Sequence, residues 1–478
     1  MTTHAGRHRV ERLAVADIGN LFIDRPGMPF QVELLAHLDG TVTSGAALTE
    51  SIAAAVESRL GLVPRLRQKV VWPRWGCGRP YWCDDARFDI AEHVHHVELS
   101  APGDDAALLD LCATIDAEVL DRSRPLWRLS VVTGLEGRRA AVLFKLHHAV
   151  ADGLAAIATL AALLDPPGTP DNPGEDGAGA VKWEPAPAPR ARTLVADNVE
   201  RRLRDVAHAL GHLAHPVESA RHLAALVASA RSDLTATRAP RTSFNRPLGP
   251  RRSLTLLHVP LADVKDAAHA AGGTVNDVVL TAVAAGLRAL LLARGESVAA
   301  PLVISVPMSM RTAAGDRAGG NAVSAVPVPV PVDTADDDAT LSRIVATTRE
   351  RKRFGRVSAY DVLSSELLPL WLQRWIMGHF ATTDQHMVNL FVTNVAGPPE
   401  AVNLAGRRIV DAYPVAPLGG NVTIGVAVLS YAGELHVTLH VDPDAIADVD
   451  VMAAGMDSAF TRLCGRGPSA GAAARTGH

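Results

Sequence analysis

The first 165 residues alternate between strand-like and helix-like patterns of hydrophobic positions. Residues 142–147 read Val-Leu-Phe-Lys-Leu-His, a run rich in β-forming side chains that predicts a mostly buried strand. Residues 154–164 are rich in Ala and Leu and predict a helix, which the sequence Asp-Pro-Pro-Gly at 165–168 would end. A strand, a sharp turn and a helix are therefore expected in succession around residue 150.

The segment from 166 to 250 has a different composition. Residues 166–190 are rich in Pro, Gly, Ala and Asp, which is typical of a linker or an exposed crossover. Residues 193–234 place Leu and Val at helical spacing among many Arg and His residues, and Pro216 is expected to break or kink this long helix. Its basic face either touches a membrane surface or lies in solvent while the apolar side packs on the body of the protein.

Short apolar runs alternate with helical segments again in the last part of the chain. Residues 274–293 predict a helix with Asn276 and Asp277 in its first turn. Strands are expected at 253–259, 303–307, 323–332, 388–393, 422–429 and 435–441, and prolines in two of them suggest edges or bulges.

These patterns together predict a mixed α/β (α+β) fold. Two sheet-and-helix halves at residues 1–165 and 251–465 would be joined by a crossover at 166–250 and followed by a disordered tail at 466–478.

Composition and charge are those of an ordinary globular protein. The 478 residues are 48% hydrophobic and 21% charged, with a net charge of −4, so nucleic-acid binding has no electrostatic support. The N-terminus lacks an apolar signal core, and no stretch reaches the roughly 20 uncharged residues that span a bilayer. These features predict a cytoplasmic protein.

Cysteine usage gives no sign of a disulfide framework, because the four cysteines are few and irregularly spaced: Cys77, Cys83, Cys112 and Cys464. The first two precede His93, His95 and His96, but their spacing matches no common zinc pattern. We therefore predict no bound metal, and ordinary loop and strand positions for these side chains.

The strongest chemical pattern is His147-His148-Ala149-Val150-Ala151-Asp152-Gly153, at the turn between the predicted strand and helix. The strand would deliver His148 to the sheet edge, where its neutral imidazole could take a proton from a bound hydroxyl or amine. Asp152 could brace the loop or pair with an Arg, and Gly153 would give the backbone freedom before the helix. The alternative is two hydrogen-bonded structural histidines and a helix-capping Asp.

The pattern His-His-x-x-x-Asp-Gly resembles the active-site motif of the CoA-dependent acyltransferases, which include chloramphenicol acetyltransferase and nonribosomal peptide condensation domains. Residues 120–127, which end in Pro125, Leu126 and Trp127, are similar to a block that precedes this motif in bacterial wax ester synthase/diacylglycerol acyltransferases. Further stretches resemble that family, in its order, at 64–69, 88–94, 276–278, 307–311, 320–321, 393–398 and 413–414.

The resemblance implies two chloramphenicol-acetyltransferase-like halves with the active site in a tunnel between them. It also implies that His148 is the general base, that His147 supports it, and that Asp152 is structural, with Arg311 either its partner or a surface residue. Asn276 would donate to the developing oxyanion, or else cap its helix.

Two further blocks have implied roles in shaping the site. Pro125, Leu126 and Trp127 would pack in the core or form a wall of the acyl tunnel. Asn394, with Gly397 and Pro398, would form a turn that shapes the site.

Two segments near the N-terminus depart from the family pattern. Where the family has Ser-Pro-x-Asp, residues 14–17 read Ala-Val-Ala-Asp. Where the family has Pro-Met-His-Val-Gly, residues 29–33 read Pro-Phe-Gln-Val-Glu, so that Gln31 replaces a His and Glu33 a Gly. If this strand lines the substrate passage, a charged Glu33 would disfavour a long apolar acceptor. If Glu33 faces solvent, it would have no such effect.

Three hypotheses follow. The first is transfer of a fatty acyl group from acyl-CoA to a lipid hydroxyl, giving triacylglycerol or wax ester. No cofactor is expected, because acyl-CoA is the donor substrate. The protein would then make peripheral contact with a membrane or a lipid droplet. The second is a specialised-metabolite or condensation-like enzyme with a polar acceptor or a carrier-tethered donor. The third is a non-catalytic lipid-binding protein, against which the intact residues of the motif argue.

Overall fold

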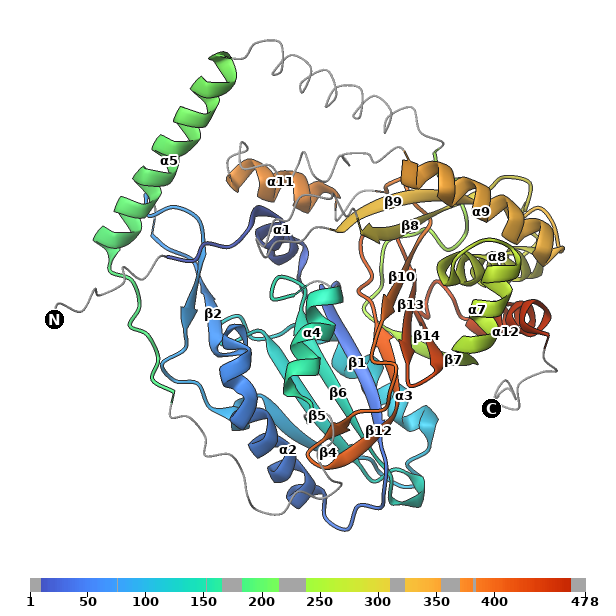
Figure 1. The fold of residues 1–478 in the computed structure, drawn as a ribbon, viewed down its shortest axis with the longest axis horizontal. Coiled ribbons are helices and arrows are strands. Elements are labelled where there is room, and N and C mark those ends of the chain that lie inside the picture. The colour runs from blue at the N-terminus through green and yellow to red at the C-terminus, as the bar shows by residue number, and fades with distance from the viewer. Residues whose placement is uncertain are drawn as a thin grey trace.

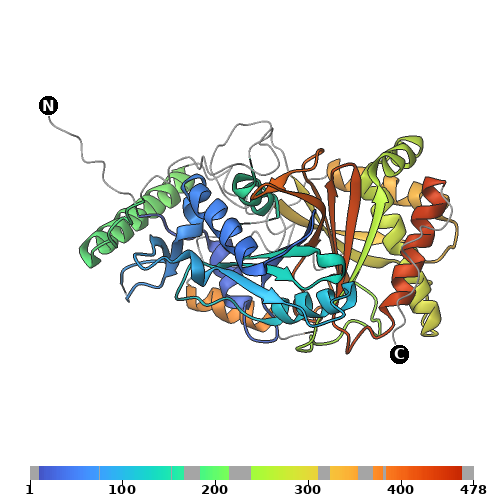
Figure 2. The same ribbon diagram turned by 90° about the horizontal axis from the view of Figure 1, so that it is seen from below.

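The computed structural model describes residues 10–74, 76–151, 153–165, 183–214, 238–309, 323–353, 370–380 and 384–465. These residues form two six-stranded sheets, each with its own helices, and a two-stranded ribbon of β2 (Gln68–Val71) and β3 (Tyr81–Asp84). Figures 1 and 2 show the sheets side by side, with α5 (Ala191–Ala214) at one end of the molecule and α12 (Val449–Cys464) at the other. The predicted mixed α/β fold of two sheet-and-helix halves is confirmed.

The first sheet has the strand order β11-β12-β1-β6-β5-β4. Its strands are β1 (Gln31–Leu38), β4 (Val94–Glu98), β5 (Trp127–Thr133), β6 (Ala140–His147), β11 (Asn403–Leu404) and β12 (Arg407–Val415). Helices α2 (Gly45–Arg59) and α4 (Gly153–Leu163) cover one face, and α3 (Asp105–Ala117) covers the other. Because both faces are covered, every residue of β6 is buried, as the continuous apolar run predicts.

The second sheet has the order β7-β14-β13-β10-β8-β9. Its strands are β7 (Ser253–Pro260), β8 (Leu302–Ser309), β9 (Val323–Val330), β10 (Leu390–Ala396), β13 (Ile424–Tyr431) and β14 (Glu434–Val441). The core packed on this sheet involves α7 (Leu261–Ala270), α8 (Val275–Ala293), α9 (Asp337–Arg353) and α12. The Pro-containing β9 lies at the edge, and β10 pairs with β8 only at Ile304 and Ser305, before Pro307, which has no N–H to donate.

Among the described residues, three longer helices, α1 (Val15–Ile23), α5 and α11 (Leu370–Phe380), and four short ones lie outside these layers. α1 precedes the first sheet, and α11 packs beside it (Figure 1). Short 3-10 helices occupy Leu60–Leu62, Pro64–Arg67, Ile90–Glu92 and Glu136–Arg138.

The first sheet contains strands from both halves of the chain. Strands β11 and β12 come from the last part of the chain, yet β12 pairs antiparallel with β1, from Glu33 opposite Val415 to Leu38 opposite Ile409. The boundary predicted at residue 251 therefore divides the chain but not the sheets. The C-terminal part supplies two strands to the N-terminal sheet.

The helix predicted at 193–234 is described from Ala191 to Ala214, where it forms α5. Arg12 holds it to the body by donating to Asp197 Oδ2 at 2.9 Å and to the carbonyl of Leu194 at 3.0 Å. Pro216, the predicted linker at 166–182 and the predicted tail at 466–478 lie outside the described residues.

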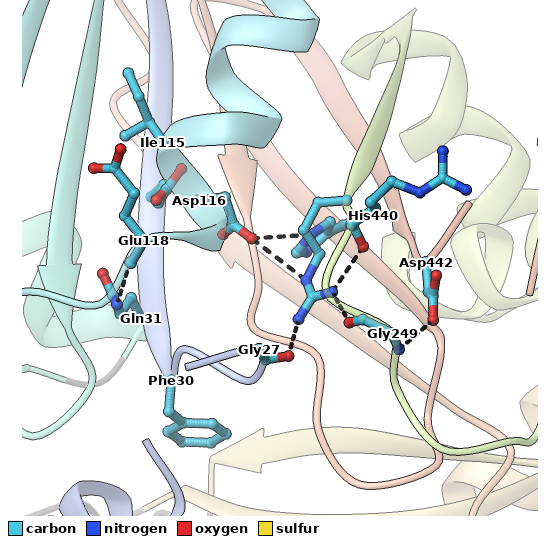
Figure 3. Close-up of polar contacts among 12 residues, drawn as sticks. Gly27, Phe30, Gln31, Ile115, Asp116, Glu118, Gly249, His440 and Asp442 are labelled. Carbon is cyan, nitrogen blue, oxygen red and sulfur yellow. Dashed lines mark hydrogen bonds and ion pairs between the residues drawn. The ribbon is translucent and has the colours of Figure 1, made fainter. Parts of the chain in front are cut away.

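A buried polar cluster joins the halves (Figure 3). Asp116, at the end of α3, lies between His440 of β14, whose Nε2 is 3.3 Å from its carboxylate, and Arg252, whose Nε is 3.7 Å away. Arg252 also donates to the carbonyl of Gly27 at 2.8 Å, in the loop that precedes β1. Burial alone would raise the pKa of Asp116, but His440, Lys145 and Arg252 lower it, so the carboxylate stays charged.

Helix α8 is long and apolar enough by composition to cross a membrane, but 67% of its most apolar window is buried inside the protein. It packs against α12 at two glycines, where the backbones approach closely. A Cβ atom added at Gly286 would lie 2.6 Å from the carbonyl oxygen of Met452, and one at Gly455 would lie 2.9 Å from the Cα of Gly286. This helix is therefore the centre of the second half.

The close approach makes Gly286 sensitive to a single methyl group. We expect Gly286→Ala to lower the free energy of unfolding by about 1–3 kcal/mol, because backbone must move to admit the Cβ. Alanine would otherwise favour a helix by about 1 kcal/mol. Gly378→Ala in α11 is the control, since nothing lies within 4 Å of its added Cβ. Urea denaturation measures both, and equal effects would refute the packing argument.

Candidate active site

The two adjacent histidines of the motif stand at the end of β6, between two neighbouring segments. The N–H of His147 donates to the carbonyl of Leu126 at 3.0 Å, and the N–H of His148 donates to the carbonyl of Phe30 at 3.2 Å. The chain then turns, and the N–H of Val150 donates back to the carbonyl of His147 at 2.8 Å. Both histidines are thus fixed by backbone hydrogen bonds on either side.

His147 is fully buried and serves as a structural link. Its Nδ1 accepts a hydrogen bond from the N–H of Ala149 at 2.9 Å, so the proton of the neutral ring is on Nε2. Nε2 faces Asp24 Oδ2 at 3.5 Å. The ring is 0% exposed, so a substrate has no access to it.

Asp24 is a residue that the sequence patterns did not identify. Its carboxylate also accepts hydrogen bonds from Arg122 at 2.8 Å and from the N–H of Phe30 at 2.9 Å. Burial by itself would raise the pKa of Asp24, but His147 and Arg122 lower it to about 2. A permanent negative charge therefore sits against His147.

His148 is half-buried, and its ring lies 5.2 Å from the ring of Phe30. The amide Nδ2 of Asn20 is 3.4 Å from its Nδ1 and 3.5 Å from its carbonyl oxygen. Asn20 and Asp24 are four residues apart at the end of α1, so they lie on the same side of that helix. The last turn of α1 therefore gives one polar partner to each histidine of the motif. An Asn and an Asp at this spacing is the sequence signal that could have identified them.

Other predicted residues of the motif are less fully placed. Gly153 is the first residue of α4, as the predicted helix start requires. Asp152 and Arg311 lie outside the described residues, so their pairing stays a prediction.

The block Pro125, Leu126 and Trp127 is buried beneath the motif. Trp127 stacks between His93, with ring centroids 4.5 Å apart, and Phe144, at 6.0 Å. Its indole N–H donates to the carbonyl of Leu66 at 2.7 Å. These contacts are those of a packed core, and the carbonyl of Leu126 is the part of the block that touches the motif.

Gln31 and Glu33 of β1 lie opposite His147 and Lys145 of the neighbouring strand β6. All four are on the face of the first sheet that α3 covers. Gln31 donates to the carbonyl of Glu118 at 3.0 Å. The solvent-facing alternative for Glu33 is wrong, because its side chain is 0% exposed. Strand alternation puts Phe30 and His148 on the opposite face of the sheet. This geometry gives no support to a substrate-binding role for Gln31 or Glu33.

Glu33 is buried without a strong partner. Lys145 Nζ lies 3.5 Å from Glu33 Oε1, but this ammonium donates to the carbonyls of Ile115, Asp116 and Glu118 at the end of α3. Burial and the nearby Asp116 raise the pKa of Glu33, Lys145 offsets only part of this, and the resulting pKa is about 8. The side chain is therefore largely neutral at pH 7.

Two asparagines sit differently from what the sequence predicted. The N-cap of α8 is Thr274, paired with Asp277 in a capping box, so the alternative that Asn276 caps the helix is wrong. Asn276 is half-buried in the first turn, and its oxyanion role stays a prediction. Asn394 lies within β10 opposite Val428 rather than in a turn, because β10 continues to Ala396.

A cleft of about 370 Å³ opens between the halves. It is lined by residues 25–28 before β1, by residues 247–250 and by Gly420 and Asn421, with Asp384. His148 is not among its lining residues, and a tunnel through the site stays a prediction.

Three of the side chains that could serve as metal ligands, Cys77, Cys83 and His93, pack in the protein core instead. Cys77 and Cys83 are buried in a small apolar cluster, and His93 Nδ1 is 2.9 Å from the carbonyl of Trp127. Among the described residues, no group of three or more His, Cys, Asp or Glu side chains is placed to hold an ion.

Comparison with known families gives matches along nearly the whole chain. The wax ester synthase/diacylglycerol acyltransferase catalytic domain matches residues 13–279, and the C-terminal domain of the same family matches residues 319–464. A probable diacylglycerol O-acyltransferase of Mycobacterium tuberculosis is 31% identical over 433 residues, which are 90% of each chain. A putative diacylglycerol O-acyltransferase of Mycobacterium bovis matches with the same identity and coverage.

Solved structures share the fold. The wax ester synthase/diacylglycerol acyltransferase of Marinobacter aquaeolei VT8 superposes with a TM-score of 0.64 at 20% identity, covering 95% of this chain and 98% of that one. The first condensation domain of the calcium-dependent antibiotic synthetase superposes with a TM-score of 0.58 at 18% identity, covering 96% and 97%. At these identities the likeness is one of fold.

The Asp24 contacts predict a loss of stability when its charge is removed. Asp24→Asn should lower the free energy of unfolding by about 1–3 kcal/mol, because the amide carries no charge and has one acceptor oxygen, where the carboxylate accepts from Arg122 at Oδ2 and from the N–H of Phe30 at Oδ1. Turnover should fall as well, since the motif loses its anchor. Asp121→Asn, at an exposed residue of the neighbouring loop, is the control. If Asp24→Asn denatures in urea like the parent and keeps full turnover, the anchoring role is disproved.

The raised pKa of Glu33 predicts how stability changes with pH. Between the ordinary pKa of 4.5 and about 8, the folded protein keeps the proton that the unfolded chain loses, so stability falls as pH rises. Glu33→Gln removes this dependence, and its melting temperature should exceed the parent's by roughly 2–6 °C at pH 8 and differ little at pH 4.5. Thermal melts across this range measure it. Glu136→Gln, at an exposed site, should track the parent, and parallel curves for Glu33→Gln would contradict the assignment.

Proposed function

The chain belongs to the wax ester synthase/diacylglycerol acyltransferase family, and from this premise we propose that it moves a fatty acyl group from acyl-CoA to the hydroxyl of diacylglycerol, with His148 as the general base. Family membership makes it an acyltransferase with a lipid acceptor. The observation that supports the base is the difference between the two histidines. His147 is sealed against Asp24, and His148 is the one with exposed surface.

The proposed reaction needs only one proton acceptor. His148 takes the proton of the acceptor hydroxyl as its oxygen attacks the thioester carbonyl, and a tetrahedral intermediate forms. That intermediate collapses by breaking the C–S bond, and the leaving CoA thiolate takes the proton from the imidazolium. The products are the ester and free CoA. Because the thioester is already activated, no covalent enzyme nucleophile is required.

The surroundings of His148 suit this task. Its backbone is fixed to Phe30, its ring packs near the ring of the same residue, and Asn20 contacts its Nδ1. A ring held in one orientation loses little freedom when the substrate arrives. Asp152 would support the turn, and Asn276 would stabilise the oxyanion.

The second hypothesis, a polar acceptor or a carrier-tethered donor, drew its support from the unusual Glu33. That side chain lies on the far face of the sheet from His148 and is largely neutral at pH 7. It therefore introduces no charge where the acceptor would react. A lipid hydroxyl remains the better-supported acceptor.

Substitution of the base tests the proposal. His148→Ala should lower kcat by roughly 10²–10⁴-fold, the usual contribution of a general base. Release of free thiol from oleoyl-CoA measures the rate, with diolein as acceptor in one arm and hexadecanol in the other. His258→Ala removes an exposed histidine of β7 and should leave the rate unchanged. Full turnover by His148→Ala would disprove the base, and no thiol release by the parent with either acceptor would disprove the function.

A further inference from the structure

Helix α11 has two faces of opposite character. Gln373 and Met377 are 4% and 7% exposed and face the protein, whereas Trp371 and Trp375 are 71% and 64% exposed. The two tryptophans are four residues apart, so they lie on one side of the helix. Among the described residues, no other tryptophan is as exposed as these two.

Such exposure is costly in water and favourable at a membrane surface. A solvent-facing tryptophan leaves a large apolar ring hydrated, and exposed aromatic patches mark interaction sites. The indole ring has an apolar body and one N–H donor, which suits the boundary between lipid headgroups and acyl chains. Two adjacent rings on one helix face would enter that boundary together.

The charge of the helix favours the same surface. The sequence of α11, Leu-Trp-Leu-Gln-Arg-Trp-Ile-Met-Gly-His-Phe, contains Arg374 and His379 but no acidic residue. Arg374 is exposed, and its guanidinium carbon lies 6.0 Å from the centre of the Phe22 ring. An aromatic face with a cation and no anion complements a bilayer that contains anionic lipid.

We propose that α11 docks this protein on a phospholipid bilayer, with Trp371 and Trp375 inserted among the headgroups. The surface continues onto α1, where the Phe22 ring is 5.7 Å from Trp72, itself 47% exposed. Figure 1 shows α11 beside α1.

The position of this surface connects it with the reaction. α1 touches α11 through Phe22 and touches His148 through Asn20. One helix therefore separates the docking face from the proposed base. The inference rests on the lipid acceptor of the proposed function, because an acceptor of that kind resides in the bilayer that α11 would contact.

A double variant tests the docking surface. Trp371→Ser with Trp375→Ser should weaken binding to vesicles of phosphatidylglycerol and phosphatidylcholine by roughly tenfold or more, measured by flotation. Both rings are exposed, so the melting temperature should stay near the parent's. Leu203→Ser on α5 is the matched control, because Leu203 is 65% exposed on another surface helix. If that control loses binding and the double variant keeps it, α5 is the docking helix and the proposal is overturned.

The exposed face of α11 would also be covered if two copies of this chain associated through it. Light scattering without vesicles should give the same mass for the parent and the double variant. A parent that self-associates, with a monomeric double variant, would overturn the proposal in favour of a contact between copies. Binding to pure phosphatidylcholine should be weaker than binding to the anionic mixture. Equal binding to both would disprove the contribution of charge.

Turnover separates docking from chemistry. With diolein in vesicles the double variant should be slower than the parent, and with a short, water-soluble alcohol in solution the two should react equally. Equal loss with both acceptors would place the tryptophans in the reaction itself and overturn a docking role. If the parent binds vesicles through α11 but releases no thiol with any acceptor, the proposed function fails while the docking surface stands.

Discussion

The pairing of β12 with β1 is the constraint on which the arrangement of the two halves depends. Because β12 belongs to the last part of the chain, its hydrogen bonds to Glu33–Leu38 tie the second half to the first sheet. β6 lies on the other side of β1, so the motif at its end is set by a strand that both halves hold in place. The Asp116 cluster adds a second tie, in which buried charges of opposite sign meet across the interface. A buried carboxylate left without its cations is strongly destabilising, so this contact favours one docking of the halves.

Within that frame, α1 gives the two adjacent histidines different surroundings. Asp24 stabilises a buried His147 whose protonation on Nε2 is fixed by the N–H of Ala149, and Asn20 contacts the half-buried His148. A strand alternates its side chains between faces, so adjacent residues at its end point apart. The buried His147 thus holds the turn, and His148 is the histidine of the motif that keeps exposed surface. The same helix meets α11 through Phe22, which brings the proposed membrane surface close to the site.

The local pattern of hydrophobic and polar residues predicted the strands and helices well, because a buried strand or a capped helix depends mainly on residues that are neighbours in sequence. The strand that ends at His147, the helix from residue 275 and the edge position of the Pro-rich β9 all follow from such patterns. The place of β12 in the first sheet could not be predicted, since the same alternation serves either sheet. Asp24 was missed because its role depends on a contact with a strand far along the chain. Thr274 and Asn276 both fit a helix start, and only the backbone geometry shows that Thr274 is the cap.

The structure changes the meaning of Glu33, a residue that departs from the family pattern. As a charged residue on a strand beside the motif, it suggested a polar acceptor. The register of β1 with β6 puts it opposite Lys145, on the face covered by α3, where burial raises its pKa to about 8. Lys145 offsets only part of this rise, because its ammonium donates to the helix-end carbonyls of α3. The substitution is therefore a strain on the core of the first half, and the side of the sheet that holds Phe30 and His148 keeps the apolar character that a lipid acceptor requires.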